Sequence, residues 1–149
     1  MSEQATIIAI AEALKDHLNA GSFSQVFNAT RQYAPAFTLE DLAALRVTVV
    51  PKSLEPTAVA RDRSHLVCQV DVGVQKKIDP SRVQQEVDAL MAVVEEIALW
   101  ICGRVLPSFT DPKWQAVTNA PIYDPEKLRT ESVFISVITV TYVATKKTV

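Results

Sequence analysis

The sequence is poor in the residues that most catalytic and cofactor sites need. It has three glycines, two histidines and two cysteines in 149 residues. The glycines stand far apart, at Gly21, Gly73 and Gly103, whereas phosphate-binding loops need them clustered. A P-loop and a dinucleotide-binding fingerprint are therefore excluded. A Gly-x-Ser-x-Gly run, which would mark a nucleophilic serine, is also missing.

The few histidines and cysteines are not arranged for metal binding. His17 and His65 lie on different predicted elements, and the chain has no Cys-x-x-Cys pair, so we expect no metal and no cofactor. Cys68 and Cys102 are expected to be reduced and structural. A disulfide between them stays open, because it needs Cα atoms within about 7 Å. Cys68 and His65 are three residues apart on a predicted strand, which directs them to opposite faces and disfavours a catalytic pair.

The charge balance gives no basic surplus. Fifteen basic and seventeen acidic side chains leave a net charge of -2, which disfavours nucleic-acid binding by the whole surface and leaves a local basic patch open. The first 21 residues lack a positively charged leader, and Glu12, Lys15 and Asp16 interrupt their apolar stretch. We therefore expect neither a secretory signal nor a membrane span, and a cytoplasmic site of synthesis. The ordinary globular composition and the absence of linkers predict a single domain over residues 1–149.

Two stretches carry the apolar spacing of long amphipathic helices. The first runs from Glu3 to Asn19. The second runs from Pro80 to Cys102, with Asp79 as its N-cap and proline in the first helical position. Its predicted core stripe comprises Val83, Val87, Leu90, Met91, Val94, Ile97 and Ile101.

Two shorter helices are expected at capping signals. Thr38 and Asp41 form a variant of the capping box, which predicts one or two helical turns. Asp124 followed by a proline predicts a single turn over Glu126–Arg129. This cap explains Asp124 better than a role as an acid in a cleft.

The remaining apolar segments alternate with the period of strands. The predicted strands are Phe23–Tyr33, limited by Pro35; Arg46–Val50, ended by Pro51; His65–Lys77; a short one at Trp114–Thr118; and Glu131–Thr145. The second and third are expected to form an antiparallel hairpin. The segment between them, Lys52–Ser64, is either a long connection or a hairpin arm that becomes ordered against a partner.

This order of elements predicts an α+β fold, with a small, mostly antiparallel sheet and two long helices packed on one face. The last strand has fifteen residues and would span about 50 Å at roughly 3.3 Å per residue. That exceeds what a sheet in a domain of this size needs. We therefore expect part of this strand to project and to pair with another subunit.

The acidic residues show no obvious shared site. Glu86 with Asp88, and Glu95 with Glu96, lie on the second long helix, where close neighbours diverge, which favours a solvated face. Asp71, on the polar face of a strand, is a candidate acid in a cleft.

The charged loop Ala60–Ser64 places Arg61 and Arg63 on either side of Asp62. It is either a solvated loop or a contact with a subunit or partner. Lysines end two predicted strands, which favours protection against unwanted edge pairing over nucleic-acid contact; they are Lys76, Lys77, Lys146 and Lys147.

Four segments carry a family resemblance: "FNATRQYAPAFTLEDLAALRVTVVP", "DVGVQKK", "VQQEVDALMAVVEEIALWI" and "NAPIYDPEKLRTESVFISVITVTYV". Their order and spacing resemble small proteins of tailed-bacteriophage head-tail and tail gene modules. The closing segment is the most distinctive. It is similar to the Pro-Ile-Tyr-Asp-Pro-x-x-Leu-Arg run that precedes a final Ser-Val-x-Thr-x-Thr-Tyr strand in that family. The resemblance covers nearly the whole chain.

The resemblance implies a structural protein similar to tail terminator or tail completion proteins. Such proteins form a ring, typically a hexamer, that caps the tail tube, stops its growth and joins it to the head. It also implies a homo-oligomer, partners among tail tube and neck or head-completion proteins, and a place in the virion tail after assembly in the host cytoplasm. Neck proteins of head closure are similar in shape and stay open as an alternative.

The family supplies no site residues, so the contact segments are inferred from the sequence. They are the loop with Arg61, Asp62 and Arg63; the irregular stretch Leu106–Lys113; and the segment around Tyr123–Arg129, with Tyr123, Lys127 and Arg129 as candidates. We expect no catalytic activity and no sequence-specific nucleic-acid binding. Two other classes stay open: a small hydrolase that uses Asp71 or Cys68, and a monomeric or dimeric adaptor such as a chaperone of phage assembly.

Overall fold

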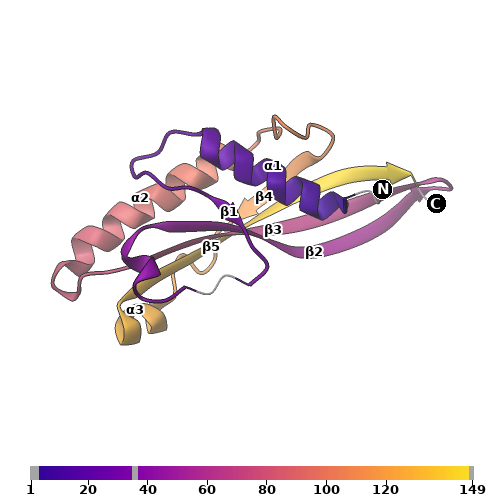
Figure 1. Ribbon diagram of the computed structural model, residues 1–149. Coiled ribbons are helices and arrows are strands. Elements are labelled where there is room, and N and C mark those ends of the chain that lie inside the picture. The colour runs from indigo at the N-terminus through magenta and orange to yellow at the C-terminus, as the bar shows by residue number, and fades with distance from the viewer. Residues whose placement is uncertain (1–3, 35–36, 148–149) are drawn as a thin grey trace.

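The computed structural model describes residues 4–34 and 37–147, and it has the predicted α+β fold. Five strands form one sheet in the order β1-β2-β3-β5-β4, in which only the β1–β2 pair is parallel (Figure 1). The strands are β1 Thr30–Arg31, β2 Arg46–Ala60, β3 Arg63–Lys77, β4 Lys113–Thr118 and β5 Val133–Lys147. The helices are α1 Thr6–Ala20, α2 Val83–Ile101 and α3 Pro125–Glu131. The predicted helix start at Glu3 and the strand limit at Pro35 lie outside the described residues.

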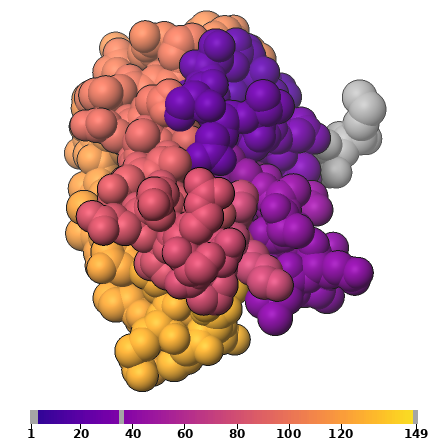
Figure 2. All heavy atoms as spheres, turned by 90° about the vertical axis from the view of Figure 1, so that its left-hand side faces the viewer, coloured from indigo at the N-terminus to yellow at the C-terminus, as the bar shows by residue number. Residues whose placement is uncertain are grey.

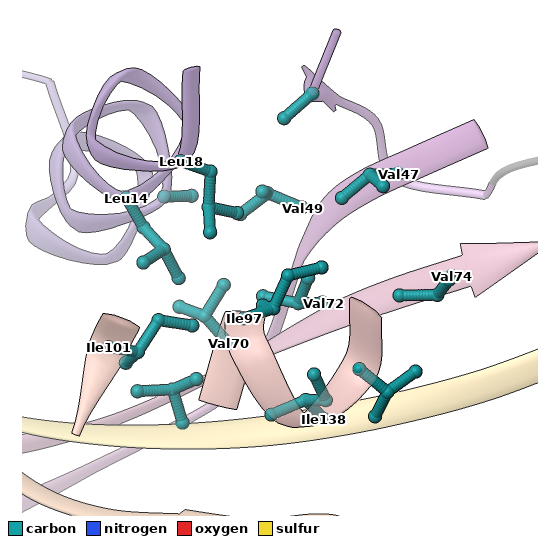
Figure 3. Packing of buried hydrophobic residues seen from close by; sticks show 14 of the residues in the cluster. Leu14, Leu18, Val47, Val49, Val70, Val72, Val74, Ile97, Ile101 and Ile138 are labelled. Atoms are coloured by element: carbon teal, nitrogen blue, oxygen red, sulfur yellow. The ribbon is translucent and has the colours of Figure 1, made fainter. Parts of the chain in front are cut away.

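The core lies between one face of the sheet and the two long helices. Val72 of β3 is opposite Val49 of β2 and Ile138 of β5, and all three are fully buried. Alternate residues of these strands continue the apolar row because side chains two apart share a face. Both helices cover this row, through Leu14 and Leu18 of α1 and Ile97 and Ile101 of α2 (Figure 3).

The predicted cap at Asp124 holds the start of α3, whereas Asp79 caps the 3-10 turn Pro80–Arg82, and α2 itself begins at Val83, three residues later than predicted. The backbone N–H of Ser81 donates to Asp79 Oδ1 at 3.0 Å, within a 3-10 turn that precedes α2. The N–H groups of Glu126 and Lys127 donate to Asp124 Oδ1 at 3.0 and 3.2 Å. These carboxylates satisfy backbone donors that a helix start leaves without partners. The short helix α3 runs for seven residues, which is longer than the single predicted turn.

The predicted capping box is present, but it begins a different helix type. The side chains and backbone N–H groups of Thr38 and Asp41 bond reciprocally at 3.1 Å. The turn that follows, Asp41–Ala43, is a three-residue 3-10 helix.

The prediction of a strand over Phe23–Tyr33 is wrong for most of its length, because only Thr30–Arg31 is a strand. Asn19 at the end of α1 replaces the neighbouring strand: its Oδ1 accepts from the N–H of Ala29 at 2.7 Å, and its Nδ2 donates to the same residue's carbonyl at 3.1 Å. Upstream, the rings of Phe23 and Phe27 stack at 5.1 Å. Side-chain contacts therefore hold this segment against the core without a strand partner.

The prediction that the second strand ends at Pro51 is also wrong. Strand β2 continues through Pro51 and Pro56 to Ala60 and turns directly into β3. The short strand β1 pairs only with Thr48 and Val49, so β2 is an edge strand beyond that point. Because no strand lies on its outer side there, the N–H groups that the prolines lack cost no hydrogen bond between strands. Residues 52–64 thus form a hairpin arm, but its strands pair within the chain and not against a partner as that alternative expected.

Strand β5 joins this hairpin, so the projecting part has three strands. It pairs with β3 along its full length, from Val133 opposite Lys77 to Lys147 opposite Arg63. The predicted projection of the last strand is thus present, but one of its two edges is already paired within the chain. We call residues 52–67 and 143–147 the arm; in Figure 1 its tip extends beyond α1 and α2.

Candidate functional site

The predicted contact residues lie on two separate surfaces. One group is at the arm tip and the other is beside the start of β5. These two ends of β5 are about 45 Å apart at roughly 3.3 Å per residue. The first group is Arg61, Asp62 and Arg63; the second is Tyr123, Lys127 and Arg129.

The arm tip presents cationic and apolar groups together. Arg61 and Arg63 are exposed, and neither makes an ion pair with another residue that the structure describes. Beside them, Val59 is 50% exposed. The tip therefore carries groups that gain from contact with an acidic, partly apolar surface.

The charged residues of α3 are paired within their own helix. Lys127 Nζ lies 2.8 Å from a carboxylate oxygen of Glu131, and Arg129 Nη2 lies 2.8 Å from Glu126 Oε1. The Glu131 carboxylate raises the pKa of Lys127. Because their charges are balanced locally, these two residues have less electrostatic gain to offer a partner than the arginines of the arm tip.

The core anchors the remaining predicted contact residues, which are Tyr123 and the irregular stretch 106–113. The ring of Tyr123 stacks on Phe134, with 6.4 Å between centroids. In the irregular stretch 106–113, Leu106 is fully buried and Phe109 packs against the core cluster. These contacts fix the position of both segments within the fold.

A groove that the sequence analysis missed runs along α2, between this helix and the segment 119–122. It has a volume of 690 Å³. Asp88 and Glu95 bring carboxylates to its lining, and they lie on one side of α2 because seven residues make two turns. The sequence signal for this shared side is the spacing of seven residues, which the pairs Glu86–Asp88 and Glu95–Glu96 do not show. We call it the α2 groove; its lining residues are Asp88, Met91, Ala92, Val94, Glu95, Ala98, Asn119 and Ile122.

The carboxylates of the α2 groove are available for an external partner. Helix α2 has four acidic residues and no lysine or arginine. Glu86 accepts a backbone N–H ahead of the helix at 2.6 Å, and Glu96 accepts the N–H of Ser24 at 2.9 Å. Asp88 and Glu95 make no ion pair with another described residue. The two acids without a local role are thus the two that line the groove.

The two residues on which a hydrolase would depend are held in structural settings. Asp71 accepts from the hydroxyl of Thr139 at 2.7 Å and lies 3.8 Å from Lys52 Nζ, on the sheet face opposite the core. Cys68 is fully buried, and burial raises the pKa of its thiol, which disfavours the reactive thiolate. Both Cys68 and Cys102 are free thiols, but Cys102 is exposed, so the predicted structural setting holds only for Cys68.

Within residues 4–34 and 37–147, no group of three or more His, Cys, Asp or Glu side chains is placed to hold a metal ion. Among the helices of that part of the chain, none is both long enough and apolar enough to cross a membrane.

Neither a scan against models of protein families nor a search of curated proteins finds a match.

Proposed function

We propose that this chain is a structural subunit of a tailed phage or prophage that forms a ring, caps the tail tube, stops its growth and joins the tail to the head. The observation that carries the proposal is the arm. Every residue from Lys52 to Ala60 is exposed, although this stretch is a strand paired with β3. A ribbon of this kind has no core of its own and gains stability when another surface covers it.

The segment with the strongest family resemblance supports the same proposal. It forms one continuous unit, in which the segment before α3 is tied to β5. The N–H of Asp124 donates to the carbonyl of Ile135 at 3.0 Å, and Asn119 Nδ2 donates to the carbonyl of Val137 at 2.7 Å. The segment thus acts as a brace that holds the base of the projecting strand.

In such a ring the arm would lie at contacts between subunits. The tail tube and neck proteins would be the partners of the assembled ring, and the protein would be located in the tail of the virion. A protein with this role needs a shape that repeats around a closed symmetry axis, and it needs no catalytic group.

The test is assembly on tail tubes. The protein is passed over a sizing column with light scattering across a range of protein and salt concentrations, imaged by negative stain, and then mixed with growing tail tubes of the encoding phage. We expect rings with a central opening, in solution or at the tube end, and an arrest of tube elongation.

Two results would count against the tail terminator role. A compact monomer that leaves tube elongation unchanged would favour an assembly adaptor or chaperone. Binding to the portal end of filled heads, without binding to tubes, would favour a head-closure protein.

A further inference from the structure

We propose that the arm tip of one copy docks in the α2 groove of the next copy. The inference deepens the proposed function and rests on its assumption that the chain assembles with itself. It identifies the two surfaces that meet, and these surfaces are different, so the contact is head-to-tail.

Charge complementarity selects the arm tip as the occupant of the groove. The tip offers the guanidinium groups of Arg61 and Arg63, and the groove offers the carboxylates of Asp88 and Glu95; within residues 4–34 and 37–147, none of these four groups makes an ion pair. Guanidinium and carboxylate groups form short, bidentate hydrogen bonds. Asp62 between the two arginines still leaves the turn with a net positive charge. The cationic side chains of α3 fit the groove less well, because their own helix already pairs them.

The spacing of the charges is compatible with two simultaneous pairs. Seven residues along a helix separate Asp88 from Glu95 by about 10 Å of axial rise. Arg61 and Arg63 lie on either side of one turn residue, and their long side chains can spread to such a distance. Each arginine can therefore reach a different carboxylate.

The apolar surroundings of the two surfaces also match. Val59 is half exposed beside the arginines. The groove wall includes Met91, Ala92 and Ile122, the last of which is 50% exposed, and Leu99 lies on the same exposed side of α2 at 65% exposure. A volume of 690 Å³ suits the side chains of a turn, because it falls within the range of ordinary ligand pockets.

The arm tip of a chain does not reach its own groove. Helix α2 lies at one end of the molecule and the arm tip at the other (Figure 1). Figure 2 looks onto the end with α2, whose surface lies between the N-terminal part of the chain and α3. A contact between unlike surfaces at opposite ends builds a ring when the rotation closes and a filament when it does not.

Reversing the charges of the arm tip and of the α2 groove in separate variants tests the contact, because mixing the two variants should restore it. The arm variant carries Arg61→Glu and Arg63→Glu, and the groove variant carries Asp88→Lys and Glu95→Lys. All four positions are exposed, so both variants should melt like the wild type. Each variant alone should associate at least about 100-fold more weakly than the wild type by sedimentation velocity.

An equimolar mixture should recover wild-type association, because an arm of either variant meets a groove of opposite charge on the other. The subunits must then alternate, so only rings with an even number of subunits close. As a control, Lys127→Glu with Arg129→Glu reverses two charges on α3 and should leave association unchanged.

A cross-link keeps the test informative if a reversed variant does not fold. In a Cys102→Ser background, copies with Asp62→Cys are mixed with copies that carry Ala92→Cys and treated with a mild oxidant. We expect a disulfide-linked heterodimer, and none when the second cysteine replaces exposed Asp16 on α1.

The results separate this inference from the proposed function. Three results would overturn the arm-to-groove contact. The first is that rings form equally well with reversed arms or grooves, and the second is that the mixture does not recover association. The third is that the wild-type chain stays monomeric at about 1 mM. If rings form despite the charge reversals, the proposed tail function is still supported. If the mixture recovers association but forms only open filaments, the arm-to-groove contact is supported and the closed ring is excluded.

Discussion

Replacing Tyr142 with phenylalanine should stabilise the protein by about 1 kcal/mol, or at least cost nothing. Tyr142 is fully buried in β5, opposite Cys68 and Trp114. Its hydroxyl has no hydrogen-bond partner among the described residues. A buried hydroxyl that loses its hydrogen bonds to water destabilises the folded state by about 1–3 kcal/mol. Phenylalanine keeps the packing of the ring and removes this cost.

A serine on the same strand and face provides the matched control. The hydroxyl of Ser136 is buried, accepts from Asn119 Nδ2 at 3.0 Å and donates to the carbonyl of Ile122. Ser136→Ala also removes a single oxygen, but it leaves partners without their hydrogen bonds. We expect it to destabilise the protein by about 1–3 kcal/mol. The two variants should therefore move the free energy of unfolding in opposite directions.

Urea and thermal unfolding at pH 7 measure both effects, and 1 kcal/mol corresponds to about 2–4 °C in Tm for a chain of this size. Alkaline pH adds a second readout. Burial raises the pKa of Tyr142. Above about pH 10 the unfolded chain releases this proton while the folded chain retains it, so the wild type should lose stability as pH rises. The phenylalanine variant should lose less.

A clear result would refute this reasoning. If Tyr142→Phe lowers the free energy of unfolding by more than about 1 kcal/mol, the hydroxyl has a partner, such as a buried water molecule. An equal loss of stability above pH 10 in both proteins would show that Tyr142 does not resist ionisation in the folded state.

Three further predictions concern stability. Leu90→Asp should abolish folding, because Leu90 is 1% exposed and the change buries an unpaired charge; circular dichroism with a wild-type melting transition would contradict it. Ser132→Gly should raise the free energy of unfolding by about 0.5–1 kcal/mol, because Ser132 has a left-handed φ of 54°, and a lower Tm would count against this. Burial lowers the pKa of His17, so stability should decline as pH falls through about 6.5, where the unfolded chain binds a proton first. His17→Phe should flatten that decline, and equal pH profiles would disprove the assignment.

The sequence predicted those parts of the fold whose signals are local. A buried face follows directly from the apolar alternation in β3 and β5 and from the apolar stripe in α2. The caps at Asp79 and Asp124 depend only on backbone N–H groups of neighbouring residues. Val83, at the start of the predicted stripe, is the exception: it is 39% exposed, because the preceding residues form a 3-10 turn and α2 begins only there.

Features that depend on distant partners were not predictable in the same way. The amide of Asn19 takes the place of a strand beside Ala29, and no period in the sequence reports such a contact. Proline normally ends a strand, and only the knowledge that β2 becomes an edge explains why Pro51 does not. The charges of residues 61–63 indicate the arm tip in the sequence itself. The sequence does not indicate the α2 groove, because the groove forms only where the segment 119–122 comes alongside the helix.

The position of β5 in the sheet has a consequence for the order in which the protein can fold during synthesis. Strand β5 is made after every other strand, yet it lies between β3 and β4. Until the ribosome releases it, β4 has no neighbour to pair with and β3 is bonded only to β2. A nascent chain that ends before Val133 thus has both long helices and a hairpin, but a gap in the middle of its sheet. The pairing that fills the gap joins distant parts of the chain, which makes it slow. During that interval the unpaired edge of β3 is open to other nascent chains, and crowded synthesis of many copies is where misassembly would begin.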